Sequence, residues 1–366
     1  MDLAQAISGV FDSPALSAAA WGFASSFTMC LLLVLTKRWH GALSMDHTIG
    51  VQKFHTAPTP RIGGIPIVLA LVVAWGKAPV DVKDMLAPIF FAGMPAFLFG
   101  VAEDITKRVG VTQRLLATMA SGILAWWITD YSLSRVNVWG VDWLLEFTVV
   151  SVILTAFAVG GIANSINIID GFNGLASTMA TLAFVGFGMI AWQVGDRALV
   201  GVSVVLAACV WGFFWVNWPF GKIFLGDGGS YFIGFALAWL AVLLIERNPS
   251  VSAFAAVVVC AHPIAEVLFS IYRRHYKELH PGHPDRLHFH SLFKQRYVRR
   301  WFSHHSNRIR NSITGVLIGL MTVVAIALAS LTYASTPWSV LAFVGLCSIY
   351  VAFYIRMVRH SWLSLF

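Results

Sequence analysis

Residues 147–175, which read FTVVSVILTAFAVGGIANSINIIDGFNGL, contain both features from which the fold is inferred. The first part, 147–163, has no charged side chain and is long enough to form a membrane-crossing helix. The second part places Asn164, Asn167, Asp170 and Gly174 three or four residues apart. If the helix continues, these four residues share one of its faces. The stretch therefore predicts a transmembrane helix that ends in a polar, ligand-binding face.

Apolar runs of similar length recur along the whole chain of 366 residues. Hydrophobic residues make up 58% of it and charged residues 11%, and its mean hydropathy is +0.75. Soluble proteins carry about 25% charged residues, so this chain cannot build a water-soluble surface. The composition excludes a Rossmann dehydrogenase, a secreted disulfide scaffold and a disordered linker. Because the runs are continuous rather than alternating, a membrane β-barrel is disfavoured, and we expect an all-α polytopic membrane protein.

We expect one membrane domain over residues 1–366 with eleven transmembrane helices, or ten as the alternative count. The expected spans are 15–36, 62–78, 85–101, 115–130, 147–163, 174–193, 198–216, 230–245, 250–272, 314–334 and 338–356. The first run is long and has no basic residue before it, so we expect a retained helix rather than a cleaved signal peptide. The four cysteines all lie in apolar runs, and we expect them to be buried and unpaired.

The distribution of Lys and Arg orients these spans. With the expected topology, 20 of the 25 Lys and Arg residues lie on the side of the loop after the first span and of the C-terminal tail. Cytoplasmic loops are enriched in Lys and Arg, so we expect the N-terminus outside and the C-terminus in the cytoplasm. The net charge of +8 reflects this bias and anionic ligands, and we expect no nucleic-acid partner.

Five segments on the expected cytoplasmic side carry unusual polar residues. They are KFHTAPTPRIGG (53–64), GVAEDITKRVGVTQR (100–114), NSINIIDGFNGL (164–175), FLGDGGS (224–230) and PGHPDRLHFHSL (281–292). We interpret them as one site, assembled from five loops at the cytoplasmic face.

The acidic residues of these segments indicate a metal ion. Glu103, Asp104, Asp170 and Asp227 repel one another if they converge, unless a cation joins them. With Asn oxygens nearby, the natural cation is Mg²⁺, which takes one or two carboxylates together with substrate phosphates. We therefore expect phosphoryl transfer between a soluble phosphate donor and a lipid acceptor, in which positioning and charge neutralisation supply most of the catalysis.

The long polar stretch 273–313 is expected to be a cytoplasmic loop rich in His and Arg. A zinc site is one interpretation of its histidines, but no cysteine joins them. A cationic, hydrogen-bonding cradle for a diphosphate is favoured. Further upstream, His262 and Glu266 lie four residues apart near the inner end of a span. Pairing with each other is one interpretation, and we expect them to line the site without a further role.

The five segments resemble the polyprenyl-phosphate N-acetylhexosamine-1-phosphate transferase family, in the family's order, from residue 53 to about 296. The resemblance implies catalytic roles for Glu103, Asp104 and Asp170. It implies that Asp227 and Asn167 bind Mg²⁺, with Mn²⁺ as a substitute. The substrate-binding residues that it implies are Lys53, Arg114, Asn164, Gly171, Asn173, Arg286, His288 and His290.

The resemblance further implies transfer of an N-acetylhexosamine-1-phosphate from a UDP-sugar to undecaprenyl phosphate, with release of UMP. Such a reaction initiates cell-envelope polysaccharide synthesis, for example of O-antigen, at the bacterial inner membrane, and the enzyme can be a homodimer. Three residues depart from the family pattern: Glu103 replaces an Asp, Asn173 stands where many members have Asp, and Ser291 replaces a common His. The last two lie in regions associated with donor recognition and leave the sugar open.

Three alternative functions fit the sequence less well. The phospho-MurNAc-pentapeptide branch of the family carries a His-His-His run that this chain lacks. A transporter of an anionic solute places its site near the bilayer midplane, whereas the charges here gather at one face. A CDP-alcohol phosphatidyltransferase requires a DGxxAR pattern, and Asp170-Gly171 is followed by Gly174-Leu175 instead.

Overall fold

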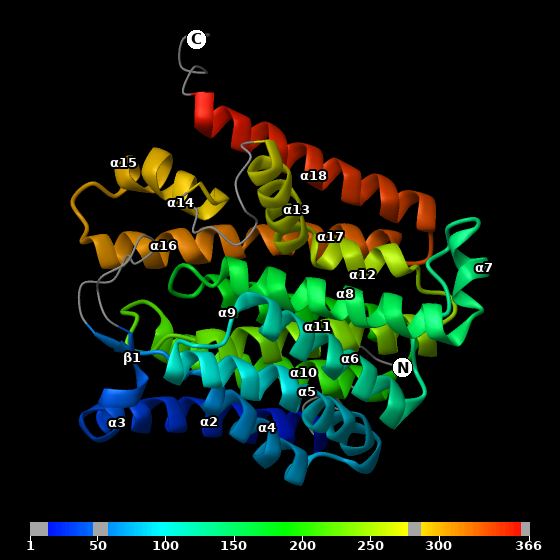
Figure 1. Ribbon diagram of the computed structural model, residues 1–366, viewed down its shortest axis with the longest axis horizontal. Coiled ribbons are helices and arrows are strands. Elements are labelled where there is room, and N and C mark those ends of the chain that lie inside the picture. The colour runs from blue at the N-terminus through cyan, green and yellow to red at the C-terminus, as the bar shows by residue number, and fades with distance from the viewer. Residues whose placement is uncertain (1–13, 47–57, 277–286, 360–366) are drawn as a thin grey trace, which may run out of the picture.

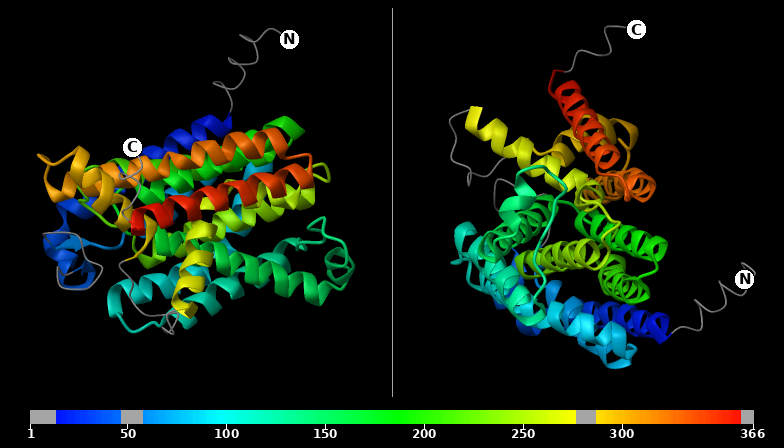
Figure 2. Two further views of the ribbon diagram at one scale, coloured as in Figure 1. Left: turned by 90° about the horizontal axis from the view of Figure 1, so that it is seen from above. Right: turned by 90° about the vertical axis from the view of Figure 1, so that its right-hand side faces the viewer.

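The computed structural model describes residues 14–46, 58–276 and 287–359. Within these ranges the chain is a bundle of long helices that run roughly side by side, with α2 and α4 along one edge and α18 along the opposite edge (Figure 1). Seen from the side, the C-terminal helices α16 to α18 form a layer against α9 and α12 (Figure 2). The two short strands β1 and β2 pair antiparallel beside one end of the bundle.

The elements have the following bounds. The long helices are α2 (Pro14–Leu35), α4 (Gly64–Lys77), α5 (Val80–Thr106), α6 (Val111–Thr129), α8 (Thr148–Ile169), α9 (Leu175–Val194), α10 (Arg197–Asn217), α11 (Gly226–Arg247), α13 (Ala261–Tyr276), α16 (Asn307–Gly319), α17 (Met321–Thr332) and α18 (Thr336–Arg359). The short elements are α3 (Lys37–Ser44), β1 (Met45–Asp46), β2 (Thr59–Pro60), α7 (Val141–Leu145), α12 (Ala253–Val259), α14 (Phe289–Phe293), η1 (Lys294–Val298) and α15 (Arg299–Trp301).

The prediction of an all-α polytopic membrane protein is confirmed. Eight helical segments of the described chain are long and apolar enough to cross a membrane, and a bent pair, α12 with α13, makes a ninth. The expected span 62–78 corresponds to α4, which at 14 residues is shorter than the others. The expected span 250–272 is not one helix, because the chain bends by 81° between α12 and α13. Hydropathy alone does not detect such a bend.

The core lies around α11, which is buried on all sides. It packs against α5 and α8, and its large side chains Tyr231, Phe235 and Trp239 are fully enclosed. Helix α8 shows the opposite arrangement on its outer face, where Val149, Ile153 and Phe157 are more than half exposed. Apolar side chains that face outward at four-residue spacing are suited to contact with lipid. The bundle therefore holds its central helix away from both lipid and water.

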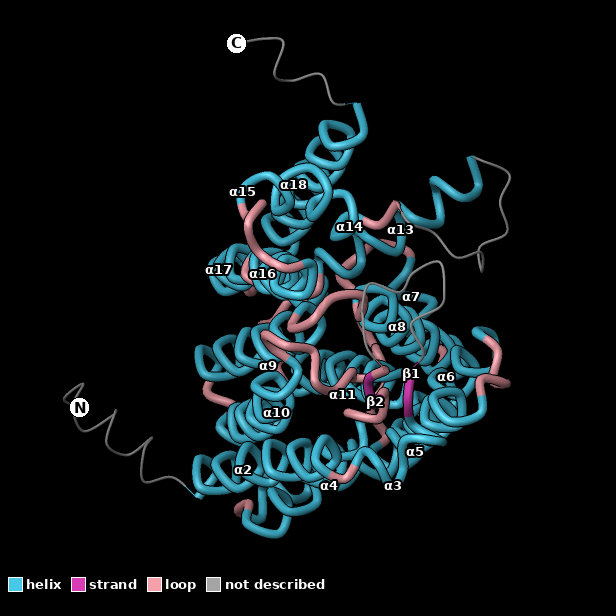
Figure 3. Tube along the Cα trace, turned by 90° about the vertical axis from the view of Figure 1, so that its left-hand side faces the viewer, coloured by secondary structure: helices cyan, strands magenta, loops and turns pink. Residues whose placement is uncertain are grey.

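One end of the bundle is built differently from the other, and we call it the site end. It is the end where α5 and α8 finish, where α11 begins, and where β1, β2 and α14 lie (Figure 3). The described part of the expected loop 273–313 is largely helical, since α13 continues to Tyr276 and residues 289–301 form α14, η1 and α15. Buried aromatic residues explain the difference, because Phe289 and Phe293 pack on Tyr350 and Phe353 of α18.

Candidate active site

The site begins where two loops from distant parts of the chain run along each other. Phe224 N–H donates to the Pro60 carbonyl over 2.8 Å, and Gly63 N–H donates to the Phe224 carbonyl over 2.9 Å. The backbones of α4 and α11 then touch, since a Cβ placed on Gly64 would lie 2.3 Å from the Gly229 nitrogen. This pairing holds Arg61 directly over the first turn of α11.

Asp104 closes the N-terminus of α11. Its Oδ1 accepts a hydrogen bond from Asp227 N–H at 2.8 Å, and its Oδ2 accepts one from Gly228 N–H at 2.9 Å. The first N–H groups of a helix lack partners within the helix, and a carboxylate there also interacts favourably with the helix dipole. Gly226 has a φ of +77°, and a Cβ there would lie 2.5 Å from Asp104 Oδ2. Asp104 thus fixes the backbone that carries Asp227.

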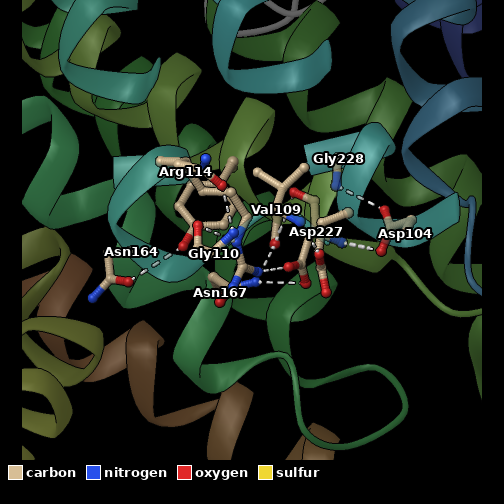
Figure 4. Close-up of polar contacts among 12 residues, drawn as sticks. Asp104, Val109, Gly110, Arg114, Asn164, Asn167, Asp227 and Gly228 are labelled. Atoms are coloured by element: carbon tan, nitrogen blue, oxygen red, sulfur yellow. Dashed lines mark hydrogen bonds and ion pairs between the residues drawn. The ribbon is translucent and has the colours of Figure 1, made fainter. Parts of the chain in front are cut away.

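Asp227 is the centre of the site and is 2% exposed. Its Oδ1 accepts hydrogen bonds from Arg61 Nη2 at 2.5 Å and from Asn167 Nδ2 at 3.1 Å, and its Oδ2 forms an ion pair with Arg114 (Figure 4). Arg61 Nε also lies 3.3 Å from Asp104 Oδ1. Two guanidinium groups therefore face one buried carboxylate, in a site made by loop 58–63 and helices α5, α6, α8 and α11.

The two asparagines of α8 face α11, as their spacing predicts. Asn167 Nδ2 also donates to Ser230 Oγ over 2.9 Å, and Asn164 Oδ1 accepts from the Tyr231 hydroxyl at 3.4 Å. The helix ends at Ile169, so Asp170 lies at its C-cap and Gly174 belongs to the following turn, with a φ of +79°. The shared polar face therefore consists of the asparagines, and Asp170 stands just beyond it.

Asp170 lies close enough to Arg61 and Asp104 to interact electrostatically with both. Burial raises the pKa of the Asp170 carboxyl to about 7, and the positive charge of Arg61 acts in the opposite direction. A carboxyl group with a pKa near neutrality can both take up and release a proton at physiological pH. Asp170 thus has the electrostatic setting of a proton-handling group.

The histidines at the start of α14, His288 and His290, form a second group of polar side chains. Both side chains are buried, and their rings stack with centroids 5.4 Å apart. A Cβ on Gly171 would lie 2.7 Å from His290 Nε2, so the glycine lets this ring reach the turn after α8. Burial lowers the pKa of His290 to about 3, and the nearby His288 acts in the same direction. His290 is therefore neutral at pH 7 and offers hydrogen bonds rather than charge to a diphosphate.

The other predicted site residues fall into two groups. Glu103 accepts a hydrogen bond from Val109 N–H at 2.8 Å and so closes the α5–α6 turn, while Asn173 donates to Ser312 Oγ over 3.1 Å and joins that loop to α16. Both hydrogen bonds connect parts of the backbone framework, and neither of them involves the Asp227 carboxylate. Lys53 and Arg286 lie outside the described residues.

Two residues of the site were given no chemical role from the sequence. Arg61 lies in the quoted segment 53–64, yet its partner Asp227 is 166 residues away in sequence, so no local spacing indicates the contact. Pairing of Glu266 with His262 was one interpretation of the sequence, but Glu266 Oε1 lies 2.9 Å from His288 Nδ1. The bend at Cys260, between α12 and α13, turns this part of the chain toward α14. The signal in the sequence that could have pointed to Glu266 is its position as a charged residue inside a predicted span.

The donor set around Asp227 fits Mg²⁺. Among the described residues there is no group of three His, Cys, Asp or Glu side chains arranged to hold a metal ion without other ligands. Mg²⁺ needs no such cage, because it is usually held by one or two carboxylates plus substrate phosphates. Asp227 supplies the carboxylate, and a rotation of the Asn167 amide by 180° turns its oxygen toward the same point. The two guanidiniums now balance the charge that a divalent cation would balance.

Comparison with known proteins confirms the family resemblance. Residues 86–245 match the model of glycosyl transferase family 4. The chain is 27% identical over 248 residues to the undecaprenyl-phosphate alpha-N-acetylglucosaminyl 1-phosphate transferase of Escherichia coli O157:H7, and this alignment covers 66% of each chain. It is 24% identical over 270 residues to the probable undecaprenyl-phosphate N-acetylglucosaminyl 1-phosphate transferase of Bacillus subtilis (strain 168), covering 73% of this chain and 74% of the relative.

The family match contains much of the site. Asp104, Arg114, Asn167, Asp170 and Asp227 all lie within residues 86–245. Arg61, Glu266 and the histidines of α14 lie outside that range. The alignment with the Escherichia coli relative spans slightly less than two thirds of either protein, so the activity and substrates in its name are not transferred by similarity alone.

Proposed function

From the premise that this chain is similar to the glycosyl transferases of family 4, we propose that it transfers a sugar-1-phosphate from a UDP-sugar to a polyprenyl phosphate. The observation that carries the proposal is the buried Asp227 carboxylate facing Arg61, Arg114 and Asn167 at the end of a lipid-facing helix bundle. Such a site accepts phosphate groups from the aqueous side and lies close to a lipid headgroup. The names of the two relatives given above contain an acceptor of the same class, undecaprenyl phosphate.

In the proposed reaction, an oxygen of the lipid phosphate attacks the sugar-bearing phosphorus of the donor. A new P–O bond forms, the P–O bond to UMP breaks, and its electron pair leaves with UMP. The second pKa of a phosphate monoester is about 6, so the attacking group is largely ionised at pH 7 without a catalytic base. Arg61 and Arg114 then stabilise the charge on the transferring phosphoryl group, as cationic clamps do in phosphoryl transfer.

The roles of the three aspartates differ. Asp227 and Asn167 hold Mg²⁺, which neutralises the donor's diphosphate when it is bound. Asp104 keeps both oxygens on the backbone of α11 and acts by positioning Asp227. Asp170, with its raised pKa, takes up any proton that remains on the attacking phosphate. His288 and His290 reach the donor's diphosphate from α14.

The proposal includes finer assignments that rest on the family resemblance. The donor is a UDP-N-acetylhexosamine, the acceptor is undecaprenyl phosphate, and the site end faces the cytoplasm of a bacterial inner membrane. The product, a polyprenyl-diphospho-sugar, initiates a cell-envelope polysaccharide. A transporter is disfavoured, because the described polar cluster lies at helix ends rather than in the middle of broken helices.

An assay with the purified full-length protein tests the proposal. The protein in detergent is supplied with undecaprenyl phosphate, Mg²⁺ and each of several UDP-sugars, including UDP-MurNAc-pentapeptide, and UMP release is recorded together with the lipid-linked product. We expect UMP only when lipid phosphate, Mg²⁺ and a UDP-N-acetylhexosamine are all present. No UMP from any donor, with protein that is folded by thermal melting, would contradict the proposed function.

A further inference from the structure

The buried carboxylate of Glu266 has no role in the reaction described so far. It lies on α13, just after the bend that follows α12, and is 0% exposed. A carboxylate enclosed by protein is costly unless hydrogen bonds and charges compensate for lost water. Three donors supply this compensation: His288 Nδ1 at 2.9 Å and Tyr350 Oη at 2.8 Å, and the Phe289 N–H at 3.2 Å from Oε2.

These contacts determine which ring nitrogen of His288 carries a proton. The Phe289 amide can only donate, and it places an acceptor oxygen of Glu266 against α14. An ionised Glu266 carboxylate has no proton to give, so His288 Nδ1 must be the donor. The other ring nitrogen, Nε2, is then left on the far edge of the ring, away from Glu266. A carboxylate that fixes the tautomer and orientation of a histidine is a recurring arrangement in metal and catalytic sites.

The same contacts distinguish the two stacked histidines. His288 has an anionic partner, whereas His290 Nδ1 is buried without a hydrogen-bond partner among the described residues. Two imidazolium rings with centroids 5.4 Å apart would repel each other. A single added proton on the pair is therefore stabilised on His288, beside the carboxylate.

We propose that Glu266 is a positioning residue that directs positive charge to His288, so that His288 Nε2–H donates a hydrogen bond to the donor's diphosphate. This inference rests on the proposed function and deepens it. The Nε2 proton stays on His288 during the transfer reaction, and no covalent bond of the protein changes. Glu266 itself does not touch the substrate.

The positioning role of the Glu266 carboxylate is tested by Glu266→Gln, which keeps the size of the side chain and removes its charge. We expect kcat/KM for the UDP-sugar to fall by about 10–100-fold, while KM for the lipid phosphate stays unchanged. The pH profile of activity should differ from that of the wild type, because the negative charge that faces His288 is removed. Among the described residues, the charged or titratable groups facing His288 and Glu266 are His262 and Arg273 of α13, His290 of α14, and Tyr350 and Tyr354 of α18. They are unchanged in this variant.

Tyr350→Phe is the matched control, because it removes the other side-chain hydrogen bond to the same carboxylate and leaves the charge in place. We expect its pH profile to match that of the wild type. If Glu266→Gln and Tyr350→Phe shift the profile equally, or if Glu266→Gln raises both KM values alike, Glu266 is only a packing residue and the inference is wrong.

A measurement without turnover separates this inference from the proposed function. Nitrogen-15 NMR of histidine-labelled wild-type protein in lipid identifies His288 by the signal that is lost in His288→Gln. We expect a protonated Nδ1 near pH 7, and a change at Nε2 when UDP is added as the diphosphate probe. A neutral ring protonated only at Nε2, or a ring whose Nε2 carries no proton when UDP is bound, would overturn the inference, even in a fully active enzyme. The expected tautomer in an inactive protein would support the inference and count against the transferase.

Discussion

At the residue scale, the site is organised by opposite charges that meet in a buried place. Asp227 carries one negative charge and faces the guanidiniums of Arg61 and Arg114. Truncation of one partner of a buried pair is strongly destabilising, because it leaves an uncompensated charge. Each of these residues therefore serves both the folding of the site end and its chemistry, and conservative substitutions are needed to separate the two.

Arg61 is expected to be a catalytic residue. Arg61→Gln keeps a hydrogen-bonding group but removes the charge that faces Asp227, so the donor's phosphates lose one of two guanidiniums. We expect kcat to fall by about 10²-fold in the UMP-release assay. Arg108→Gln is the control, since Arg108 is an exposed arginine at the same end of α5. Equal activity of the two variants would contradict the role of Arg61.

Titration of Asp170 makes the free energy of unfolding of the protein depend on pH. Its pKa rises from 3.8 in the unfolded chain to about 7 in the folded protein. Its stabilising contribution is therefore fully present below pH 3.8 and is lost as the pH rises through about 7. We expect the melting temperature of the wild type, in chelator, to fall from about pH 6 to about pH 8 more steeply than that of Asp170→Asn. Parallel curves for the two proteins would show that Asp170 does not titrate in this window.

Individual site residues were predictable where a short motif contains them. Asn164, Asn167 and Asp227 lie in polar segments at helix ends, and the structure brings all three together. Arg61 and Glu266 were not assigned because their partners are distant in sequence. Glu103 and Asn173 lie in the same motifs, but their hydrogen bonds go to Val109 N–H in the α5–α6 turn and to Ser312 of α16 rather than to the Asp227 carboxylate. A motif predicts which loops meet, whereas the direction of each side chain follows from packing.

At the element scale, the crossing of α4 and α11 sets the position of Asp227. The two backbones approach so closely that Gly64 and Gly229 leave no room for a side chain between them. Sequence periodicity predicts both helices but not this contact, because glycine contributes nothing to an apolar face. The bend between α12 and α13 was missed for a similar reason, since mean hydropathy is the same for a straight and a bent helix.

Gly64→Ala tests this crossing. Its added methyl would lie 2.3 Å from the Gly229 nitrogen, so the helices must separate. Overpacking of this kind costs about 1–3 kcal/mol, and we expect a lower melting temperature and weaker turnover. Gly76→Ala is the control, because it lies on the same helix with nothing within 4 Å of the added methyl. If both variants melt alike, the close contact of α4 and α11 is not a determinant of stability.

At the scale of the whole molecule, the polar chemistry is confined to one end of the bundle. The opposite end has its own ion pair between Arg247 and Asp196, at the start of α10, but no cluster of arginines around a buried acid among the described residues. Length and hydropathy predicted the helical bundle because each span repeats the same simple pattern. The number of spans does not follow from hydropathy alone: α4 is short, α6 at the expected span 115–130 is not one of the eight candidate segments, and α13 leaves the direction of α12.

The predicted orientation can be measured in intact cells. Ser303, after α15, and Trp139, before α7, are both exposed and lie at opposite ends of the bundle. In a background with Cys347 replaced, we expect a membrane-impermeant maleimide to label Trp139→Cys in intact cells and Ser303→Cys only after permeabilisation. The reverse pattern would place the site end outside the cytoplasm, where UDP-sugars are not available.

The most direct test of the account compares wild type, Asp227→Asn and Asp196→Asn in the same assay for UMP release and lipid-linked product. Asp227→Asn keeps the shape of the side chain but removes the charge at the centre of the site, and we expect turnover to fall on the order of 10³-fold in a protein that still folds. Asp196→Asn removes an acid at the opposite end and should leave turnover unchanged. Near-normal product formation by Asp227→Asn would contradict the assignment of the site.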